Sequence, residues 1–323
     1  MYRKISAIVV PTLIAIGIIA YMILRVWGDL LVALKHLVPT FLIIAIMIFV
    51  GGMLLRGWRY RIILKSLNYN VPLTKSTACI FISQTANLIV PARLGDFVRI
   101  FILNHEYQTT YSEGISSIVV ERVFDIIMVA LLGAISLPFV LNVPSWFYTV
   151  IIIPLVIGAS FFGFLIICGR LEAHNKYIQV VLTMLHEIRR ASLTISSVLT
   201  LSFSSIFIWI LDVMVCLAVV LMFGQQIPFA IVVLAIVIGN LVKAVPITPG
   251  GVGTYELSLA LTFELAGISP AISTLIAVID HLIKNLVTLA GGIISIYLLG
   301  DWVIPTIKKA LNMRLEGGKI TDS

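Results

Sequence analysis

Charged residues are scarce in this sequence. Only 11% of the 323 residues are Asp, Glu, Lys or Arg, whereas 60% are hydrophobic, and the mean hydropathy is +1.12. An ordinary soluble domain is about half apolar and about a quarter charged. The shortage of charge therefore excludes a water-soluble fold and indicates an integral membrane protein.

Cysteines are also few, at Cys79, Cys168 and Cys216. They fall inside apolar runs and lack the paired spacing of a disulfide framework or a zinc site, so we expect packing residues, no metal and no cofactor. The net charge of +7 would suggest nucleic acid in a soluble protein. In a membrane protein the basic residues are first assigned to loops, and we expect no nucleic-acid partner.

Six apolar runs are each near or above the roughly 18–20 residues that a helix needs to cross a bilayer. They lie at 5–24, 38–55, 126–143, 146–168, 193–223 and 271–299. The first run follows Arg3 and Lys4, and its length and lack of a small-residue cleavage site favour a retained helix over a signal peptide. We expect a multi-pass, all-α protein of the cell membrane.

Two further segments, 75–104 and 229–265, contain the Pro and Gly residues that interrupt a membrane helix. If each enters the membrane and returns to the same side, 15 of the 22 Lys and Arg residues fall in the cytoplasmic segments 1–4, 56–75, 170–190 and 301–323. This arrangement satisfies the positive-inside rule. We therefore predict six full spans and two re-entrant broken-helix hairpins, with both termini in the cytoplasm.

The segments that begin near 39, 75 and 115 have counterparts near 193, 229 and 271. Each half has three crossings, so the second half is inverted relative to the first. We predict membrane repeats at 1–145 and 146–300, an amphipathic interfacial connector at 170–192 and a cytoplasmic tail at 301–323. Interrupted segments at matching positions of an inverted repeat point to a transporter binding site near the bilayer midplane.

The first break contains Arg93, Asp96 and Arg99 at three-residue steps between Pro91 and the following apolar run, with Gly95 among them. A helix that starts after Pro91 would place the three charged residues on one face and aim its free N–H groups at the break. Two arginines there would clamp an anion, most simply a phosphate. Alternatively, Asp96 neutralises an arginine and the trio anchors the hairpin to the headgroup layer.

The second break is rich in glycine, which lets backbone approach a ligand closely. We expect its exposed N–H groups to form an anion-binding concavity that faces Lys243, or else a hinge without a ligand. Its candidate residues are Lys243, Thr248, Pro249, Gly250, Gly251, Gly253, Tyr255 and Glu256.

Two clusters of ionisable residues follow the breaks. Glu121, Arg122 and Asp125 lie one to two turns inside a helix from about 115, where they either join the site or lie at the interface. Asp280 lies roughly 14 Å along the last span, near the midplane. There Asp280 and Lys284 can pair, and His281 suits proton coupling, although a self-neutralised packing cluster is the alternative.

Further polar residues lie at membrane depth, namely Gln84, Asn87, Asp212, Asn240 and Glu264. Asn87 and Asn240 precede the two breaks, and we expect them to form interhelical hydrogen bonds. Asp212 and Glu264 have no partner that the sequence identifies.

The strings PARLGDFVRIFIL at 91–103, ERVFDII at 121–127 and PITPGGVGTYELSLAL at 246–261 together resemble the lysylphosphatidylglycerol synthase transmembrane-domain family. The resemblance covers most of 35–300 and implies roles for the motif residues in both breaks and for Glu121, Arg122 and Asp125. Asp96 replaces the usual Glu, and His281 stands where relatives often have Arg. Nothing the size of an aminoacyltransferase domain follows residue 301, so we expect no lipid aminoacylation by this chain.

The resemblance implies a flippase for aminoacylated phosphatidylglycerol or a protein that acts beside polyprenyl-phosphate glycosylation enzymes. From the two opposed basic breaks in an inverted repeat, we expect a flippase or transporter for an anionic phospholipid or a lipid-linked, polyprenyl-type phosphate, and not an enzyme. Arg93, Arg99 and Lys243 would hold the phosphate, the amides of Gly250–Gly253 would receive it, and Glu256 would release or position an arginine. The alternatives are a membrane-embedded transferase acting on a lipid phosphate and a non-transporting scaffold. Expected partners are membrane lipids and a separate glycosyltransferase or lipid-modifying enzyme, and a homodimer is left open.

Overall fold

The computed structural model describes residues 2–34, 37–90, 93–140, 144–168, 176–245 and 247–307. Within these ranges every regular element is a helix. The helices are α1 Tyr2–Leu34, α2 Thr40–Ser66, α3 Leu73–Ile89, α4 Gly95–Tyr107, α5 Tyr111–Ser136, α6 Ser145–Cys168, α7 Lys176–Ser192, α8 Ile195–Met222, α9 Phe229–Ala244, α10 Thr254–Leu265 and α11 Pro270–Leu299, with 3₁₀ turns η1 Leu137–Phe139 and η2 Pro249–Gly251.

In the part of the chain that the structure describes, five helices are long and apolar enough to cross a membrane, which confirms a multi-pass membrane protein. These stretches are Val10–Asp29, Thr40–Ser66, Ser145–Ile167, Ile195–Met222 and Pro270–Leu299. The sixth expected run, 126–143, lies largely in α5, which has 26 residues and ends at Ser136. Helix α5 contains four charged residues, Glu113, Glu121, Arg122 and Asp125.

Helix α2 continues past the apolar run at 38–55 and ends at Ser66. Arg56 and Arg59, expected in a cytoplasmic loop, are therefore helical and face the interior. Arg59 is 1% exposed and donates to Asp125 of α5 at 2.5 Å. The expected loop was wrong for these two residues because a carboxylate on another helix compensates their charge inside the bundle.

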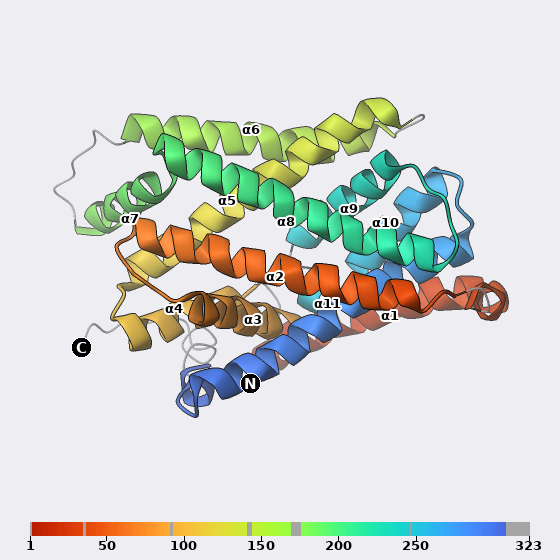
Figure 1. The fold of residues 1–323 in the computed structure, drawn as a ribbon, viewed down its shortest axis with the longest axis horizontal. Coiled ribbons are helices and arrows are strands. Elements are labelled where there is room, and N and C mark those ends of the chain that lie inside the picture. The colour runs from red at the N-terminus through yellow and green to blue at the C-terminus, as the bar shows by residue number, and fades with distance from the viewer. Residues whose placement is uncertain are drawn as a thin grey trace.

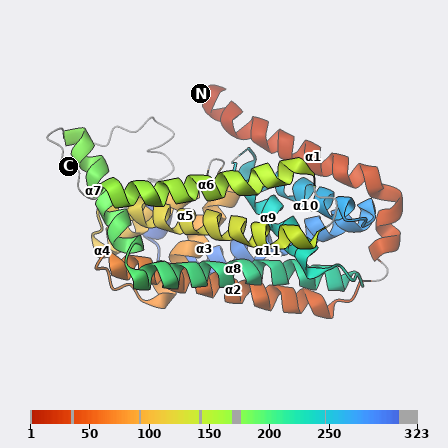
Figure 2. The same ribbon diagram turned by 90° about the horizontal axis from the view of Figure 1, so that it is seen from above.

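Each interrupted segment forms a pair of short helices that pack against each other. These pairs are α3 with α4 and α9 with α10. The first pair lies toward one end of the long axis and the second toward the other, while α2, α6 and α8 run along that axis (Figure 1; Figure 2). Pro91 and Pro246, expected to cause the breaks, lie outside the described residues.

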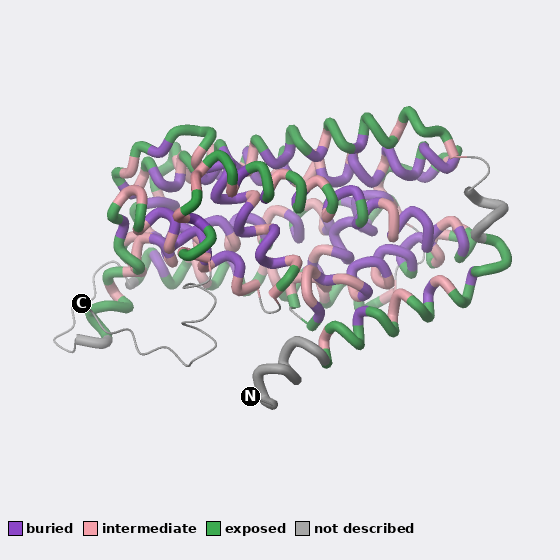
Figure 3. The backbone as a smooth tube through the Cα atoms, turned by 90° about the horizontal axis from the view of Figure 1, so that it is seen from below, coloured by how far each residue is buried: buried purple, intermediate pink, exposed green. Residues whose placement is uncertain are grey.

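Packing partners follow the same scheme in both halves. Helices α2 and α8 occupy matching positions and pack on each other. Helix α3 packs on α11, and its counterpart α9 packs on α5. Helix α1 also packs on α11, and its counterpart α6 packs on α5. Figure 3 shows buried residues along the turns that face the interior and exposed ones along the outer turns. Helix α9 is the most enclosed element of its half, because every residue from Val232 to Gly239 is buried.

Helix α7 occupies the expected connector from residue 176 onward. It packs on α5 through Glu187, which accepts hydrogen bonds from Ser112 and Ser116 at 2.8 Å. Ile178 and Val181 on its outer side are more than half exposed, at 51% and 54%. Residues 170–175 of the connector and 308–323 of the tail lie outside the described residues.

The first hairpin depends on Gly95. A Cβ at this position would lie 2.4 Å from the Ser83 carbonyl oxygen and 2.5 Å from the Asn87 nitrogen. We expect Gly95→Ala to force α3 and α4 apart and to lower the free energy of unfolding by about 1–3 kcal/mol. Thermal unfolding in detergent would measure the loss. Gly51→Ala in α2 is the control, because nothing lies within 4 Å of that Cβ; an equal change in both variants would contradict the prediction.

Candidate functional site

A cavity of about 150 Å³ lies between the two hairpins, roughly ten times the space that one water needs. Its wall comes from α2, α3, α5, α8, α9, α10 and α11, from the turn that contains η2, and from Val90 and Arg93 of the α3–α4 break. The charged lining residues are the basic Arg56, Arg93, Arg122, Lys243 and Lys284 and the acidic Glu121, Asp125 and Asp212. The cavity wall thus has five basic and three acidic side chains.

Every carboxylate that lines the cavity is already paired with a base. Glu121 lies 2.7 Å from Arg99, Asp125 lies 2.5 Å from Arg59, and Asp212 lies 3.2 Å from Lys284. Pairing of this kind lowers the cost of ionised groups at membrane depth. Any unpaired charge in the cavity is therefore positive.

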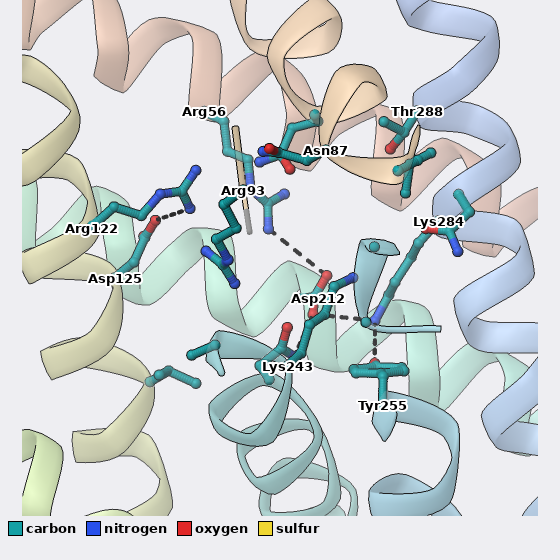
Figure 4. Close-up of a pocket in the computed structure, with 18 of the residues that line it drawn as sticks. Arg56, Asn87, Arg93, Arg122, Asp125, Asp212, Lys243, Tyr255, Lys284 and Thr288 are labelled. Atoms are coloured by element: carbon teal, nitrogen blue, oxygen red, sulfur yellow. Dashed lines mark hydrogen bonds and ion pairs between the residues drawn. The ribbon is translucent and has the colours of Figure 1, made fainter. Parts of the chain in front are cut away.

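Arg93 is the first unpaired cation. It lies in the α3–α4 break with φ +53° and is partly exposed to the cavity. No described residue forms an ion pair or hydrogen bond with its side chain. Figure 4 shows Arg93 between Arg122 and Asp125 on one side and Asp212 and Lys243 on the other.

Lys243 is the second unpaired cation, and it comes from the end of α9 at the other break. Its Nζ lies 3.0 Å from Nε2 of His281 and 5.3 Å from the centre of the Tyr255 ring. No described carboxylate lies within 4.0 Å of this ammonium group. Each hairpin break thus contributes one cation without a counter-ion to the same cavity.

Asp96 organises the first hairpin instead of facing the cavity. It accepts hydrogen bonds from Ser83 at 2.9 Å and Asn87 at 3.0 Å on α3, and Arg122 of α5 donates to both of its oxygens. The Asn87 contact is interhelical, as the sequence predicts.

The expected clamp of Arg93 and Arg99 is not formed. Arg99 is fully buried, pairs with Glu121 and lies 4.5 Å from the Tyr60 ring centre, so it does not line the cavity. The physical reason is the helix start: α4 begins at Gly95, and Arg93 lies before it in a left-handed conformation. The three-residue steps therefore do not place Arg93 on the helix face of Arg99.

A network of ion pairs and hydrogen bonds surrounds Lys284. This residue lies 3.0 Å from Asp280 and 3.2 Å from Asp212, and Tyr255 donates to Asp280 at 2.7 Å. Asp212 also accepts from Asn240 at 3.4 Å and lies 3.9 Å from Arg56. Asp212 thus has the partners that the sequence does not identify, as does Glu264, which pairs with Arg25 at 3.0 Å.

The glycine-rich break uses its amides internally. Gly251 N–H donates to the Thr248 carbonyl at 3.1 Å, and Gly253 N–H donates to Oε2 of Glu256 at 2.7 Å. The expected run of free N–H groups is therefore wrong at these positions. Oε1 of Glu256 lies 2.7 Å from Nδ1 of His281, so among the described residues the ion-pair partner of Glu256 is a histidine and not an arginine.

The family model described as the lysylphosphatidylglycerol synthase TM region matches residues 8–292. The chain belongs to this family. Glycosyltransferase AglD of Haloferax volcanii is 28% identical over 331 residues, which cover 88% of this chain but 53% of that protein. The chain thus spans about half the length of this relative. A UPF0104 membrane protein of Methanocaldococcus jannaschii is 27% identical over 221 residues, covering 66% of this chain and 93% of that protein.

A UPF0104 membrane protein of Methanothermobacter thermautotrophicus is 23% identical over 323 residues, covering 90% of this chain and 96% of that protein. No solved structure matches the chain. Among the described residues, no group of three or more His, Cys, Asp or Glu side chains is placed to hold a metal ion.

The structure divides the sequence-predicted residues of this family member into two groups. Those that line the cavity are Asn87, Arg93, Glu121, Arg122, Asp125, Asn240, Lys243, Thr248, Gly250, Gly251, Tyr255 and Lys284. Those that do not line the cavity are Gly95, Asp96, Arg99, Pro249, Gly253, Glu256, Asp280 and His281. Pro91 lies outside the described residues. Headgroup binding by the first group stays a prediction.

Sequence reasoning missed several lining residues. Arg56 was assigned to a loop, and Gln84, Asn285 and Thr288 were given no role at the site. Trp209 was also missed; its Nε1 donates to the Asp125 carbonyl at 3.1 Å. The sequence did contain a signal for the residues on α3 and α11. Gln84 lies three positions before Asn87, and Thr288 lies four positions after Lys284, so each pair shares one face of an otherwise apolar helix.

Glu121 is the centre of an ion-pair network in the first half of the chain, because it lies within ion-pair distance of Arg99, Arg59 and Arg122. We expect Glu121→Gln to leave the buried Arg99 without its ion-pair partner, since Arg59 and Arg122 keep Asp125 and Asp96, and to lower the free energy of unfolding by about 3–5 kcal/mol. Glu106→Gln is the control, since its partner Lys75 is 40% exposed, and should cost at most about 1 kcal/mol. Thermal unfolding in detergent tests both, and equal losses would argue against the network.

Proposed function

We propose that the chain is a flippase or transporter for an anionic phospholipid or a lipid-linked phosphate. The observation that carries the proposal is the pair of unpaired cations, Arg93 and Lys243, which come from different hairpin breaks and face one cavity. A phosphate between them supplies the missing counter-charge, and charge-assisted hydrogen bonds of this kind are about twice as strong as neutral ones.

The proposed topology has six spans, with α5 as the sixth, and the hairpins α3–α4 and α9–α10 as re-entrant segments. At 1.5 Å per residue, the 26 residues of α5 extend about 39 Å, enough to cross the roughly 30 Å hydrocarbon core. The first and last residues of each hairpin would then lie on the same side of the membrane, with both chain termini in the cytoplasm.

The proposed inverted repeat is supported by contacts that recur at equivalent positions. In each half, a carboxylate in the first turn after the break pairs with a basic residue on the next long helix: Asp96 with Arg122, and Glu256 with His281. The ion pair of Arg59 with Asp125 also has a counterpart of reversed charge, Asp212 with Lys284. Inverted repeats with interrupted helices favour a binding site between the halves.

Single cysteines beside the hairpins test the topology in a background without the native cysteines. We expect Asn70→Cys and Tyr111→Cys, which flank the first hairpin, to react with a membrane-impermeant maleimide from the cytoplasmic side. Gln226→Cys and Ser269→Cys, which flank the second, should react from the outside. All four residues are exposed. Labelling of the two members of either pair from opposite sides would show that the hairpin crosses.

Reconstituted vesicles test the transport itself. We expect the purified protein to move acyl-labelled phosphatidylglycerol, and Arg93→Gln with Lys243→Gln to slow this movement at least about tenfold, because two charge-assisted contacts are lost. Arg61→Gln is the matched control, since Arg61 is exposed on α2. Unchanged translocation in the double variant would overturn the assignment of the cavity.

A lipid-phosphate transferase is the second candidate function, motivated by the name of the Haloferax volcanii relative. Glu121, Asp125 and Asp212 are the carboxylates that face the cavity, and each is held by a base. Incubation of pure protein with polyprenyl phosphate and nucleotide-sugar donors, followed by mass spectrometry, distinguishes the two. A new lipid product without lipid translocation would favour the transferase. Co-purification of an enzyme, with neither a new lipid product nor lipid translocation by the pure protein, would favour a scaffold.

A further inference from the structure

The part of the cavity wall formed by α3 and α11 carries three uncharged polar side chains near Asn87 and Lys284. Gln84 of α3 and Asn285 of α11 both line it, and these two helices pack on each other. Both side chains are partly exposed, and neither carboxamide has a hydrogen-bond partner among the described residues. Thr288 lies on the same wall, three residues after Asn285. A carboxamide offers both a donor and an acceptor to the cavity, so a ligand with hydroxyl groups is a natural partner of this wall.

The charge pattern excludes an amine at the same place. An ammonium group needs a free carboxylate, but Glu121, Asp125 and Asp212 are each within 3.2 Å of an arginine or lysine nitrogen. The unpaired charges, Arg93 and Lys243, would repel a cationic headgroup. The cavity is therefore suited to a negative group followed by a neutral one.

The spacing along α3 fits such a headgroup. Gln84 precedes the last residue of the helix, Ile89, by five positions, which corresponds to about 7 Å along the helix axis. Arg93 lies just beyond that end. A phosphate at the break and a hydroxylated group of sugar or glycerol size would together cover this distance.

We propose that the ligand is a lipid phosphodiester whose headgroup is an uncharged polyhydroxyl group, either a sugar or a glycerol. Arg93 and Lys243 hold the phosphate, and the carboxamides of Gln84 and Asn285 hydrogen-bond to the hydroxyl groups. This inference rests on the proposed lipid transport and names the substrate class of the same cavity.

Matched lipids with the same single negative charge test the inference. The assay measures how well unlabelled lipids compete with labelled phosphatidylglycerol for translocation in vesicles. The first pair of competitors is phosphatidylglycerol and phosphatidylmethanol. The second pair is a polyprenyl phosphohexose and a polyprenyl methyl phosphate. We expect the hydroxylated member of at least one pair to compete about tenfold better, as one or two added neutral hydrogen bonds predict. The pair that shows the difference distinguishes glycerol from sugar. Lysyl-phosphatidylglycerol should compete less well than phosphatidylglycerol.

Variants of Gln84 and Asn285 test whether these side chains cause the preference for hydroxylated lipids. In Gln84→Leu combined with Asn285→Leu, the ratio between the hydroxylated and the methyl lipid should fall toward one. Because both lipids are measured on the same variant, the ratio does not depend on how much protein folds. Gln226→Leu, an exposed amide between α8 and α9, should keep the wild-type ratio.

Two results would overturn the inference while leaving lipid transport in place. These are equal competition within both pairs for the wild-type protein, and stronger competition by lysyl-phosphatidylglycerol than by phosphatidylglycerol. Absence of translocation of both labelled phosphatidylglycerol and a labelled polyprenyl phosphohexose by the wild-type protein would instead remove the proposed function, and the inference with it.

Discussion

The structure depends on the neutralisation of charge inside an apolar bundle. Arg59 and Arg99 are 1% and 0% exposed, and both lie within ion-pair distance of Glu121. An unpaired ion at such a depth costs several kcal/mol, so α2, α4 and α5 must pack in the one arrangement that brings these groups together. The same condition explains why α2 continues beyond its apolar run. Ion pairing thus fixes the wall of the cavity as well as the packing of the first half.

Close backbone approach is the second condition, and it positions the cation of the second break. Gly251 has φ +75°, and a Cβ there would lie 2.5 Å from Cγ of Lys243. A Cβ at Gly250 would lie 3.1 Å from a methyl carbon of Leu88, which belongs to the other hairpin. The glycines therefore let the Lys243 stem pack on the loop and bring the two breaks together. Their role is steric, whereas the sequence suggested that their amides bind the ligand.

Much of the fold follows from local patterns in the sequence, but the pairing of charges does not. Apolar runs predict most long helices, and Pro and Gly residues predict both hairpins within a few positions of their observed bounds. Asn87 and Asn240 form the interhelical hydrogen bonds expected of them. The position of Arg99 could not be predicted, since it depends on where α4 begins. Asp212 likewise has its partners on α2, α9 and α11, and no spacing along the chain reveals these.

The cavity combines one unpaired cation from each half, and this matters for the proposed transport. A lipid phosphodiester held by Arg93 and Lys243, as proposed, would share its single negative charge between the two breaks, so the bound state would favour their approach. Lys243 also contacts His281, which contacts Glu256, and Glu256 accepts the Gly253 N–H that begins α10. A ligand that draws Lys243 toward the cavity therefore pulls on a chain of hydrogen bonds that ends at the backbone of the second break. Binding and movement of that hairpin would be coupled through three side chains.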